Sequence, residues 1–559
     1  MESNRSDIDS RAHDAFKLLN ANQPDQAERI CNTILESDPK HFDALHCLGI
    51  AHFQRSRFDQ AVIAFTHALE VRPDSDIYSN LGLALAKLNL HKEAVDCYDA
   101  AVSLNANNAI AYYNRGNSLL HSSKLAEALE NYDHAIAINP AYAAALSNRG
   151  NVLRSMKLLP QALASYDQAI TLMPENAMVL NNRGVIWMEL NRPADALNDY
   201  DRALAITPDY TEALYNKGNA LLALRQIESA SEYFDKSVAT DLDNADAHLN
   251  RALFLLATGD FEQGWAEYEW RWKRGSFEAS HHFSQPLWTG KEELAGKTIL
   301  LYAEQGLGDT IQFVRYIRMV KALGANIILE VQAPLKSLMS TLENVDQLVV
   351  QGEELPPFDY HCMLMSLPFT FNSSRENIPA PTSYLKTPND KSAYWSDKLG
   401  ELPAPKIGIS WSGNPDHKND HNRSIPLQWL INRLPPEFNY ISLQKELREA
   451  DREALESNTK LLSFTEQLQD FSDLAGLIDH LDMVISVDTS VAHLAGALGK
   501  PVCILLPYSP DWRWMQSGES SPWYPTAKLF RQPALSDWES AIDQLNQYLR
   551  KFLTQNSLG

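Results

Sequence analysis

The chain is poor in cysteine and has no long hydrophobic run. Its 559 residues include five cysteines, which are far apart and form no CxxC pair. This pattern indicates neither a disulfide framework nor a zinc knuckle, and it favours a reducing compartment. No stretch holds about 18 uninterrupted apolar residues, and the first residues contain no apolar core of signal-peptide length. We therefore expect a cytoplasmic protein without integral membrane association.

The chain also lacks an excess of positive charge. Lysine and arginine together number 49 against 71 aspartate and glutamate residues, so the formal net charge is −22. Nucleic acids and anionic membranes are bound through basic faces, so neither is an expected partner. A phosphate-bearing ligand would have to be held by a local group of residues. With 45% hydrophobic residues, the chain is long and apolar enough for several folded domains.

Several catalytic motifs are absent. The turn at residues 306–311, GLGDTI, lacks the third glycine of a dinucleotide-binding fingerprint, and there is no P-loop, HExxH or GxSxG sequence. The Asp-x-Asp triplets at residues 7–9, 74–76 and 241–243 lie in the N-terminal tail or in turns between repeats. None of them offers a catalytic metal site, so we expect no metal cofactor.

A 34-residue period runs through the first half of the chain. Glycine recurs with this step, and a column of aromatic residues keeps the same step. The glycines are Gly82, Gly116, Gly150, Gly184 and Gly218, and the aromatic residues are Tyr98, Tyr132, Tyr166, Tyr200 and Phe234. This period is typical of tetratricopeptide repeats, in which small residues let paired helices approach. We expect an α-helical solenoid of about eight repeats over residues 8–278, degenerate at both ends.

Asparagine also recurs once in each repeat. The positions are Asn80, Asn114, Asn148, Asn182, Asn216 and Asn250. The column resembles the asparagine ladder that lines the superhelix of O-linked N-acetylglucosamine transferases, which combine tetratricopeptide repeats with a two-lobed catalytic unit. That resemblance implies binding of an acceptor or partner peptide through its backbone. The other interpretation, that the amides bond neighbouring repeats, is equally open at this point.

Charged residues keep the same period on both sides of the aromatic column. Basic residues follow the asparagines at Arg115, Arg149, Arg183, Lys217 and Arg251, and acidic residues recur at Asp99, Asp133, Asp167, Asp201 and Asp235. Opposite charges with one common period predict a ladder of ion pairs between helices.

The second half of the chain predicts an α/β structure. After a connector at 279–296, short apolar runs alternate with helical stretches, which is typical of parallel sheets covered by helices. A proline-rich break at 379–405 separates a first lobe, residues 297–388, from a second, residues 404–553. Two such lobes bind ligands in the cleft at the carboxyl ends of their strands.

Two strand-to-helix junctions carry the candidate chemistry. Residues 300–315, LLYAEQGLGDTIQFVR, bring Gly306 and Gly308 to a helix start, where backbone N–H groups can approach an anionic ligand. Residues 483–502, MVISVDTSVAHLAGALGKPV, form a second junction of the same kind. The sequence therefore predicts two nucleotide-type folds that face each other.

The second half resembles glycosyltransferase family 9, the lipopolysaccharide heptosyltransferases, and in particular bacterial proteins in which tetratricopeptide repeats precede such a domain. The matching stretches are AEQGLGDTIQFVRY, ISWSGNPDHKNDHNRSIPL, VISVDTSVAHLAGALGKPV and PDWRWMQSGESSPWYPTAKLFRQ. The resemblance implies a two-lobed, GT-B-like fold of double Rossmann type. It also implies inverting, metal-independent transfer of a hexosyl or heptosyl group from a nucleotide-diphosphate sugar, with the acceptor on the first lobe and the donor on the second.

Asp309 matches the aspartate that these enzymes use as general base. Inversion needs a carboxylate beside the acceptor hydroxyl to take its proton. The alternative role of Asp309 is to cap the following helix, and Glu304 is the reserve candidate for the base.

On the donor side, Arg423 falls where the family keeps a phosphate-binding lysine, and Lys418 is a second candidate for the diphosphate. Asp488, Thr489 and His493 match the acidic, hydroxyl and imidazole positions of the family. The remaining donor-site candidates are Ser490 and Trp411, together with Gly306 and Gly308. The alternative for His493 is a structural helix histidine, and the aromatic cluster around Arg513 is more typical of a core than of a ligand site.

Two classes of function fit these observations. The first is a glycosyltransferase whose repeats select a protein acceptor. The second is a non-catalytic repeat scaffold with a nucleotide-binding or decayed transferase domain. Transfer to a lipid-linked glycan is a third interpretation, disfavoured because the acidic chain lacks an evident basic amphipathic anchor.

Overall fold

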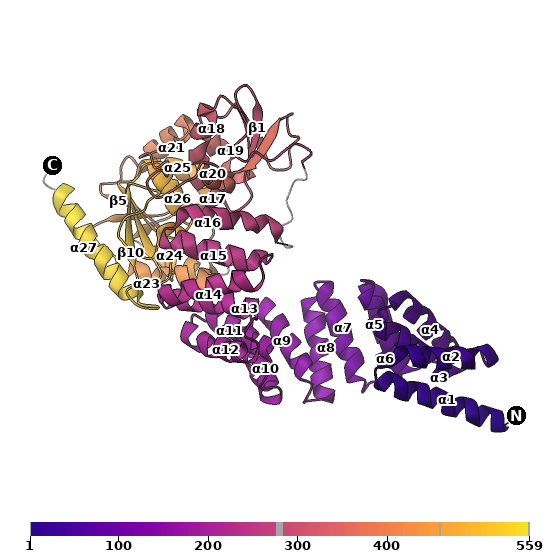
Figure 1. Ribbon diagram of the computed structural model, residues 1–559. Helices are drawn as coiled ribbons and strands as arrows, with labels where there is room; N and C mark the ends of the chain where they lie inside the picture. The colour runs from indigo at the N-terminus through magenta and orange to yellow at the C-terminus, as the bar shows by residue number, and fades with distance from the viewer. Residues whose placement is uncertain (1, 275–282, 418, 458–459, 557–559) are drawn as a thin grey trace. The chain divides into compact units, whose positions relative to one another are not determined.

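The first half of the chain is a helical-repeat array (Figure 1). The computed structural model describes residues 2–274, 283–417, 419–457 and 460–556. Consecutive helices pack as pairs, and short polar turns join them. The helices are α1 (Glu2–Asn20), α2 (Pro24–Ser37), α3 (Phe42–Gln54), α4 (Phe58–Val71), α5 (Ser75–Lys87), α6 (His91–Leu104), α7 (Ala109–His121), α8 (Leu125–Ile138), α9 (Ala143–Ser155), α10 (Leu159–Leu172), α11 (Ala177–Glu189), α12 (Pro193–Ile206), α13 (Thr211–Ala223), α14 (Ile227–Thr240), α15 (Ala245–Thr258) and α16 (Phe261–Tyr268).

The chain divides into two compact units. One comprises Met1–Leu190 with Asn198–Pro208, and the other comprises Asn191–Leu197 with Asp209–Gly559. The second unit contains the last repeats as well as the α/β part of the chain. Within the described residues, no helix combines the length and the apolar character needed to cross a membrane.

The glycine and aromatic columns pack against each other inside every repeat that carries them. A Cβ atom on Gly150 would lie 2.8 Å from the ring of Tyr166, and one on Gly116 would lie 2.8 Å from the ring of Tyr132. Such distances leave no room for a side chain, so glycine lets the second helix of each repeat press its aromatic ring against the first.

The predicted ladder of ion pairs is confirmed at four steps. Arginine bonds the aspartate 16 positions earlier in each case. The pairs are Arg115 with Asp99, Arg149 with Asp133 (2.6 Å), Arg183 with Asp167 (2.7 Å) and Arg251 with Asp235 (2.8 Å). The carboxylates are half exposed, so each pair contributes only modestly to stability.

The asparagine column forms hydrogen bonds within the array. Asn148 donates to Asn117 Oδ1 at 2.9 Å, and the same oxygen accepts from the hydroxyl of Tyr132 at 2.8 Å. Asn182 donates in the same way to Asn151 at 3.3 Å. Similar roles hold at Asn80, which lies 3.1 Å from His46 Nε2, and at Asn250, which accepts from Asn219 and donates to Asp246 O. Asn114 is buried and Asn216 partly buried.

These contacts support structural amides at Asn80, Asn148, Asn182 and Asn250. Peptide binding by the column stays a prediction.

The second half contains two parallel sheets. The first has four strands in the order β3-β2-β1-β4, and the second has six strands in the order β10-β9-β8-β5-β6-β7. The strands are β1 (Thr298–Tyr302), β2 (Asn326–Val331), β3 (Gln347–Val350), β4 (Tyr360–Met363), β5 (Lys406–Ser410), β6 (Asn439–Ser442), β7 (Leu461–Leu462), β8 (Met483–Val487), β9 (Val502–Leu506) and β10 (Ala527–Arg531). In the register of the second sheet, Ile409 pairs with Ile485 and Val487 with Leu505. Strands β8 and β9 are buried throughout, as expected when both faces of a parallel sheet are covered.

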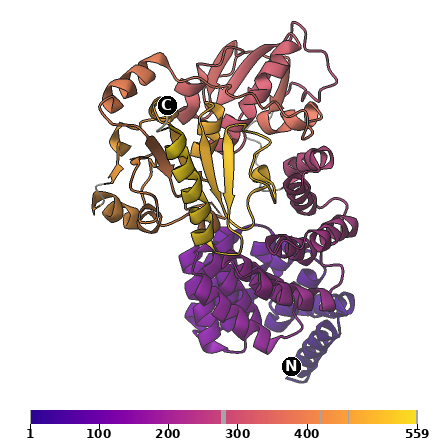
Figure 2. The ribbon, with the colours of Figure 1, turned by 90° about the vertical axis from the view of Figure 1, so that its left-hand side faces the viewer.

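Short helices connect and cover these strands, and Figure 2 shows α27 running alongside the second sheet. The helices are α17 (Leu307–Phe313), α18 (Ile317–Ala322), α19 (Lys336–Met339), α20 (Leu367–Thr370), α21 (Asn389–Leu399), α22 (Asp420–Arg423), α23 (Leu427–Ile431), α24 (Glu449–Ser457), α25 (Phe471–Asp479), α26 (Ser490–Ala497) and α27 (Trp538–Asn556), and the 3₁₀ turns are η1 (Glu269–Lys273), η2 (Val314–Tyr316), η3 (Ala333–Leu335), η4 (Leu364–Ser366), η5 (Thr465–Gln467) and η6 (Trp512–Trp514). The proline-rich segment 379–405 is more than a break, because it contains α21. The predicted connector 279–296 begins outside the described residues.

The last repeat shares its core with the α/β part of the second unit. Trp265 of α16 is buried, and its ring lies edge-on to Trp512 at 5.3 Å and to Phe313 at 6.0 Å between centroids. Phe313 ends α17, which follows β1 of the first sheet. Trp512 begins η6, which follows β9 of the second sheet. The last repeat is therefore packed against elements of both sheets.

Candidate active site

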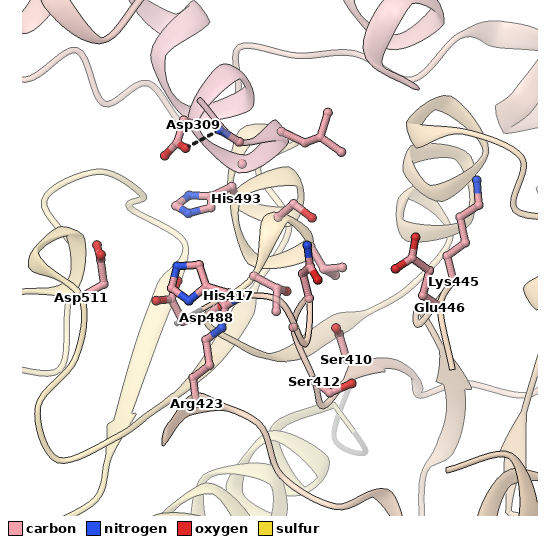
Figure 3. A pocket seen from close by; sticks show the side chains of 18 of the residues that line it. Asp309, Ser410, Ser412, His417, Arg423, Lys445, Glu446, Asp488, His493 and Asp511 are labelled. Carbon is pink, nitrogen blue, oxygen red and sulfur yellow. Dashed lines mark hydrogen bonds between the residues drawn. The ribbon is translucent and has the colours of Figure 1, made fainter. Parts of the chain in front are cut away.

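A cavity of about 1090 Å³ opens at the carboxyl ends of the strands in the second unit. Loops that follow β1, β5, β6 and β8 line it, together with residues from α15 and α16. Figure 3 shows part of the lining. Of the candidate residues, the cavity brings together Gly306, Gly308, Asp309, Arg423, Asp488, Thr489, Ser490 and His493. The structure thus collects the two predicted junctions in one place.

The first junction is shaped by a close approach of two helices. A Cβ atom on Gly308 would lie 3.0 Å from His493 Cδ2 and 3.5 Å from Ser490 Cα. Glycine at this position lets the start of α17 pack directly against the start of α26. The close packing places Asp309 and His493 on neighbouring walls of the cavity, as Figure 3 shows.

Asp309 makes two contacts and still faces the cavity. Its Oδ2 accepts from the N–H of Gly306 at 2.9 Å, so the helix-capping role considered above is present. Its Oδ1 accepts from the guanidinium of Arg513. The side chain remains 21% exposed and lines the cavity, so capping does not remove the carboxylate from the site.

Arg513 is the main site residue that sequence reasoning missed. It is buried, and besides Asp309 its guanidinium donates to Gln312 Oε1 at 2.9 Å and to Asp511 Oδ1 at 2.8 Å. The two carboxylates, Asp309 and Asp511, raise the pKa of Arg513 against the opposing effect of burial. The available signal was its place in PDWRW, shortly after the buried run of β9. The surrounding tryptophans Trp514 and Trp523 are buried core residues, as the core interpretation of the aromatic cluster predicted.

Glu304, the reserve candidate for the base, does not line the cavity. Its carboxyl group is 2% exposed, accepts from the N–H of Met365 at 3.2 Å and lies 3.4 Å from Arg271 Nη2. Burial raises the pKa of Glu304 to about 7, although Arg271 opposes the shift. The group is therefore part of a buried ionic cluster behind the site.

The second junction presents polar groups at the end of β8. Burial and the neighbouring Asp511 raise the pKa of Asp488 to about 6. The backbone oxygen of Asp488 accepts from Arg423 Nη1 at 2.8 Å. Thr489 and Ser490 follow at the start of α26, so their hydroxyl groups and the first helical N–H groups border the cavity.

His493 is buried and held in a fixed orientation. Its Nδ1 lies 2.8 Å from the hydroxyl of Tyr524, and its ring stacks on Trp514 with centroids 5.3 Å apart. Burial and the nearby arginines lower the pKa of His493 well below its ordinary value, so the imidazole is neutral at pH 7. A neutral ring keeps one nitrogen as donor and the other as acceptor.

The guanidinium of Arg423 lines the cavity with one nitrogen that makes no hydrogen bond. Its side chain is largely buried, and its Nε donates no hydrogen bond although it lies 3.7 Å from Asp420. The guanidinium lies directly over Gly413, where an added Cβ atom would be 2.5 Å from Nη2. Gly413 is thus a second position that sequence reasoning missed, since only its place in ISWSGN pointed to it.

Of the donor-site candidates that the structure describes, Trp411 is not brought to the cavity lining. Trp411 is fully buried in the core of the second sheet, and its indole N–H donates to Asp451 Oδ2 at 2.9 Å. Lys418 lies outside the described residues. Among the residues that the structure describes, no group of three or more histidine, cysteine, aspartate or glutamate side chains is placed to hold a metal ion.

Known families match both halves of the chain. Models of tetratricopeptide repeats match residues 17–76, 46–109, 116–157, 147–211 and 187–252, and the model described as glycosyltransferase family 9 (heptosyltransferase) matches residues 443–536. The chain carries tetratricopeptide repeats followed by a glycosyltransferase family 9 domain. The matched part of this domain includes Asp488, His493 and Arg513, whereas Asp309 and Arg423 lie before it.

Similar proteins match parts of this chain. Protein FlbA of Caulobacter vibrioides is 26% identical over 318 residues, which are 52% of this chain and 52% of FlbA. Protein O-mannosyl-transferase TMTC1 of Mus musculus is 28% identical over 99 residues, which are 17% of this chain and 10% of that protein. The chain thus spans about half or less of these relatives. A solved tetratricopeptide repeat protein from Parabacteroides merdae covers 44% of this chain and 98% of its own, with 16% identity and a TM-score of 0.36.

Proposed function

We propose that this protein is an inverting, metal-independent glycosyltransferase that uses a nucleotide-diphosphate sugar. In this proposal the two sheets are the lobes of a GT-B-like, double Rossmann-type domain, with residues 297–388 on the acceptor side and 404–553 on the donor side. The main support is that Asp309, Arg423 and His493, from three separate segments, line one cavity. Hexosyl and heptosyl donors both remain compatible with it.

The donor diphosphate would lie between Arg423 and the start of α26. Arg423 has an uncommitted Nε, and a guanidinium neutralises phosphate oxygens through paired hydrogen bonds. The hydroxyl groups of Thr489 and Ser490 and the N–H groups of the helix start add donors for the same anion. The raised pKa of Asp488 reduces the negative charge next to this anion near pH 6.

Asp309 would act as general base. As the acceptor oxygen attacks the anomeric carbon from the face opposite the diphosphate, the bond to the phosphate oxygen breaks and its electron pair leaves with the nucleotide. The acceptor proton passes to the carboxylate of Asp309. Arg513 acts as a positioning residue, because it bonds one oxygen of this carboxylate and is itself held by Gln312 and Asp511.

The acceptor would be a protein or peptide that the repeats select, and the cytoplasm would be the place of the reaction. One observation favours the alternative of a non-catalytic scaffold with a nucleotide-binding domain. Both oxygens of Asp309 already accept hydrogen bonds in the structure, from Gly306 and from Arg513. Each carboxylate oxygen has a second lone pair, so these bonds do not prevent proton uptake.

Calorimetric titration with UDP, GDP, ADP and CDP tests the donor site. We expect one nucleotide to bind in the micromolar range, and Arg423→Ala and His493→Ala to weaken it by about tenfold to a hundredfold, since hydrogen bonds to charged groups contribute about 1.5–3 kcal/mol. Arg433→Ala, an exposed arginine outside the cavity lining, is the matched control. If a folded protein binds none of the four nucleotides, the transferase proposal fails.

Asp309→Asn separates binding from chemistry. This variant should bind the same nucleotide with unchanged affinity and should not transfer sugar from a panel of labelled nucleotide sugars. Full transfer by the variant would refute the assignment of Asp309 as base.

A further inference from the structure

The last repeat contributes apolar side chains to the cavity, and the donor site does not use them. Leu249 and Leu253 of α15 both line the cavity, and both are partly exposed. They are four positions apart, so they lie on one face of the helix. Tyr268, at the end of α16, lines the same cavity.

Leu253 occupies a position at which three of the preceding repeats carry asparagine. The equivalent positions, at multiples of 34 residues before it, are Leu83, Asn117, Asn151, Val185 and Asn219, so three of the five carry asparagine. These asparagines bond other groups of the array. Asn117 accepts from the hydroxyl of Tyr132, Asn151 accepts from the hydroxyl of Tyr166, and Asn219 donates to Asn250. In the last repeat this amide is replaced by an apolar side chain at the point where the array meets the cavity.

We propose that Leu249 and Leu253 form an acceptor subsite for a polypeptide, which takes an apolar side chain flanking the residue whose hydroxyl is glycosylated. The proposal rests on the proposed function and adds the class of acceptor sequence to it. Leu249, Leu253 and Asp309 line one cavity, so the two leucines and the proposed base face the same space. A peptide that presents a hydroxyl to Asp309 has its neighbouring residues within reach of this wall.

The apolar side chains of Leu249 and Leu253 disfavour a glycan or a lipid-linked molecule as acceptor. A glycan needs hydrogen-bonding groups for its hydroxyls, and leucine side chains offer none. A lipid-linked acceptor would be brought to the site by a basic surface, whereas this chain has a net charge of −22. An apolar side chain is the group that gains by contact with two partly exposed leucines.

Binding of the full-length protein to a peptide array tests the subsite. The array carries short peptides with a central serine or threonine, and each flanking position is varied through all residue types. Four proteins are compared: the wild type, Leu249→Asn, Leu253→Asn and Leu242→Asn. The substitution at 253 introduces the amide that three earlier repeats carry. Leu242 is 69% exposed, precedes the same helix and does not line the cavity, so it is the matched control.

We expect the wild type and Leu242→Asn to prefer an apolar residue at one flanking position by about tenfold over a polar residue. Leu249→Asn and Leu253→Asn should lose most of this preference while binding the nucleotide as the wild type does. The inference is overturned if no position shows an apolar preference, or if both cavity variants, shown to be folded by circular dichroism, keep it.

The outcomes for the subsite and for the proposed function are distinguishable. Nucleotide binding without a leucine-dependent preference overturns the subsite and leaves the transferase proposal standing. A leucine-dependent preference without nucleotide binding supports the subsite as a peptide-binding surface and overturns the transferase proposal.

Discussion

The buried carboxyl group of Glu304 makes the stability of the second unit depend on pH in a predictable way. Glu304 lies behind the cavity, 2% exposed, with Arg271 as its charged neighbour. Burial raises its pKa from the ordinary 4.5 to about 7. The change we propose is Glu304→Gln, which keeps the shape of the side chain and removes its titration.

Proton linkage determines whether the free energy of unfolding rises or falls with pH. The folded state binds the proton of Glu304 more tightly than the unfolded chain does, so the stabilisation is complete below pH 4.5 and is lost as pH rises through 7. A shift of this size corresponds to about 3 kcal/mol in the free energy of unfolding, at about 1.4 kcal/mol for each pKa unit. The sequence pI is about 5.2, and a protein near its pI tends to precipitate. Unfolding is therefore measured between pH 6 and pH 8. About 1.3 kcal/mol of the contribution is lost in this window.

The assay is urea unfolding of the wild type and Glu304→Gln at pH 6 and pH 8, followed by tryptophan fluorescence. All of the twelve tryptophans except Trp187 lie in the part of the second unit from Asp209 onward, so the signal reports this unit. Relative to the wild type, Glu304→Gln should gain about 1.3 kcal/mol between the two pH values.

Glu343→Gln is the control, because Lys386 lowers the pKa of Glu343 and its contribution is lost only below pH 4.5. Equal pH dependence of the wild type and Glu304→Gln would refute the reasoning.

Two further predictions concern packing and charge. Gly308→Ala should lower the free energy of unfolding of the second unit by about 1–3 kcal/mol, because its Cβ atom would meet the fixed ring of His493 at 3.0 Å; an unchanged unfolding midpoint would show that the ring gives way. A double-mutant cycle that exchanges the charges of Arg149 and Asp133 should reveal a coupling of about 0.3–1 kcal/mol in thermal unfolding followed by circular dichroism; zero coupling would show that this ion pair does not stabilise the array.

Local and periodic features of this protein could be predicted from the sequence. The 34-residue period predicts the helical repeats, because each repeat buries its glycine and aromatic positions against its own partner helix, as Gly150 and Tyr166 do. Strand-to-helix junctions are also local, so Asp309 and His493 could be assigned to helix starts before the structure was known. The ion pairs of the array follow from the same period, because their partners are always 16 residues apart.

Contacts between distant segments were decided by the tertiary structure alone. Arg513 meets Asp309 across 204 positions of sequence because η6, after the second sheet, packs beside α17, after the first. Trp411 directly follows strand β5, at the place of a ligand residue, yet its side chain is buried in the core of the second sheet. Leu249 and Leu253 read as ordinary repeat residues, and only the packing of the last repeat against both sheets brings them to the cavity. Sequence periodicity records which face of an element is apolar, whereas the choice of what covers that face depends on the whole fold.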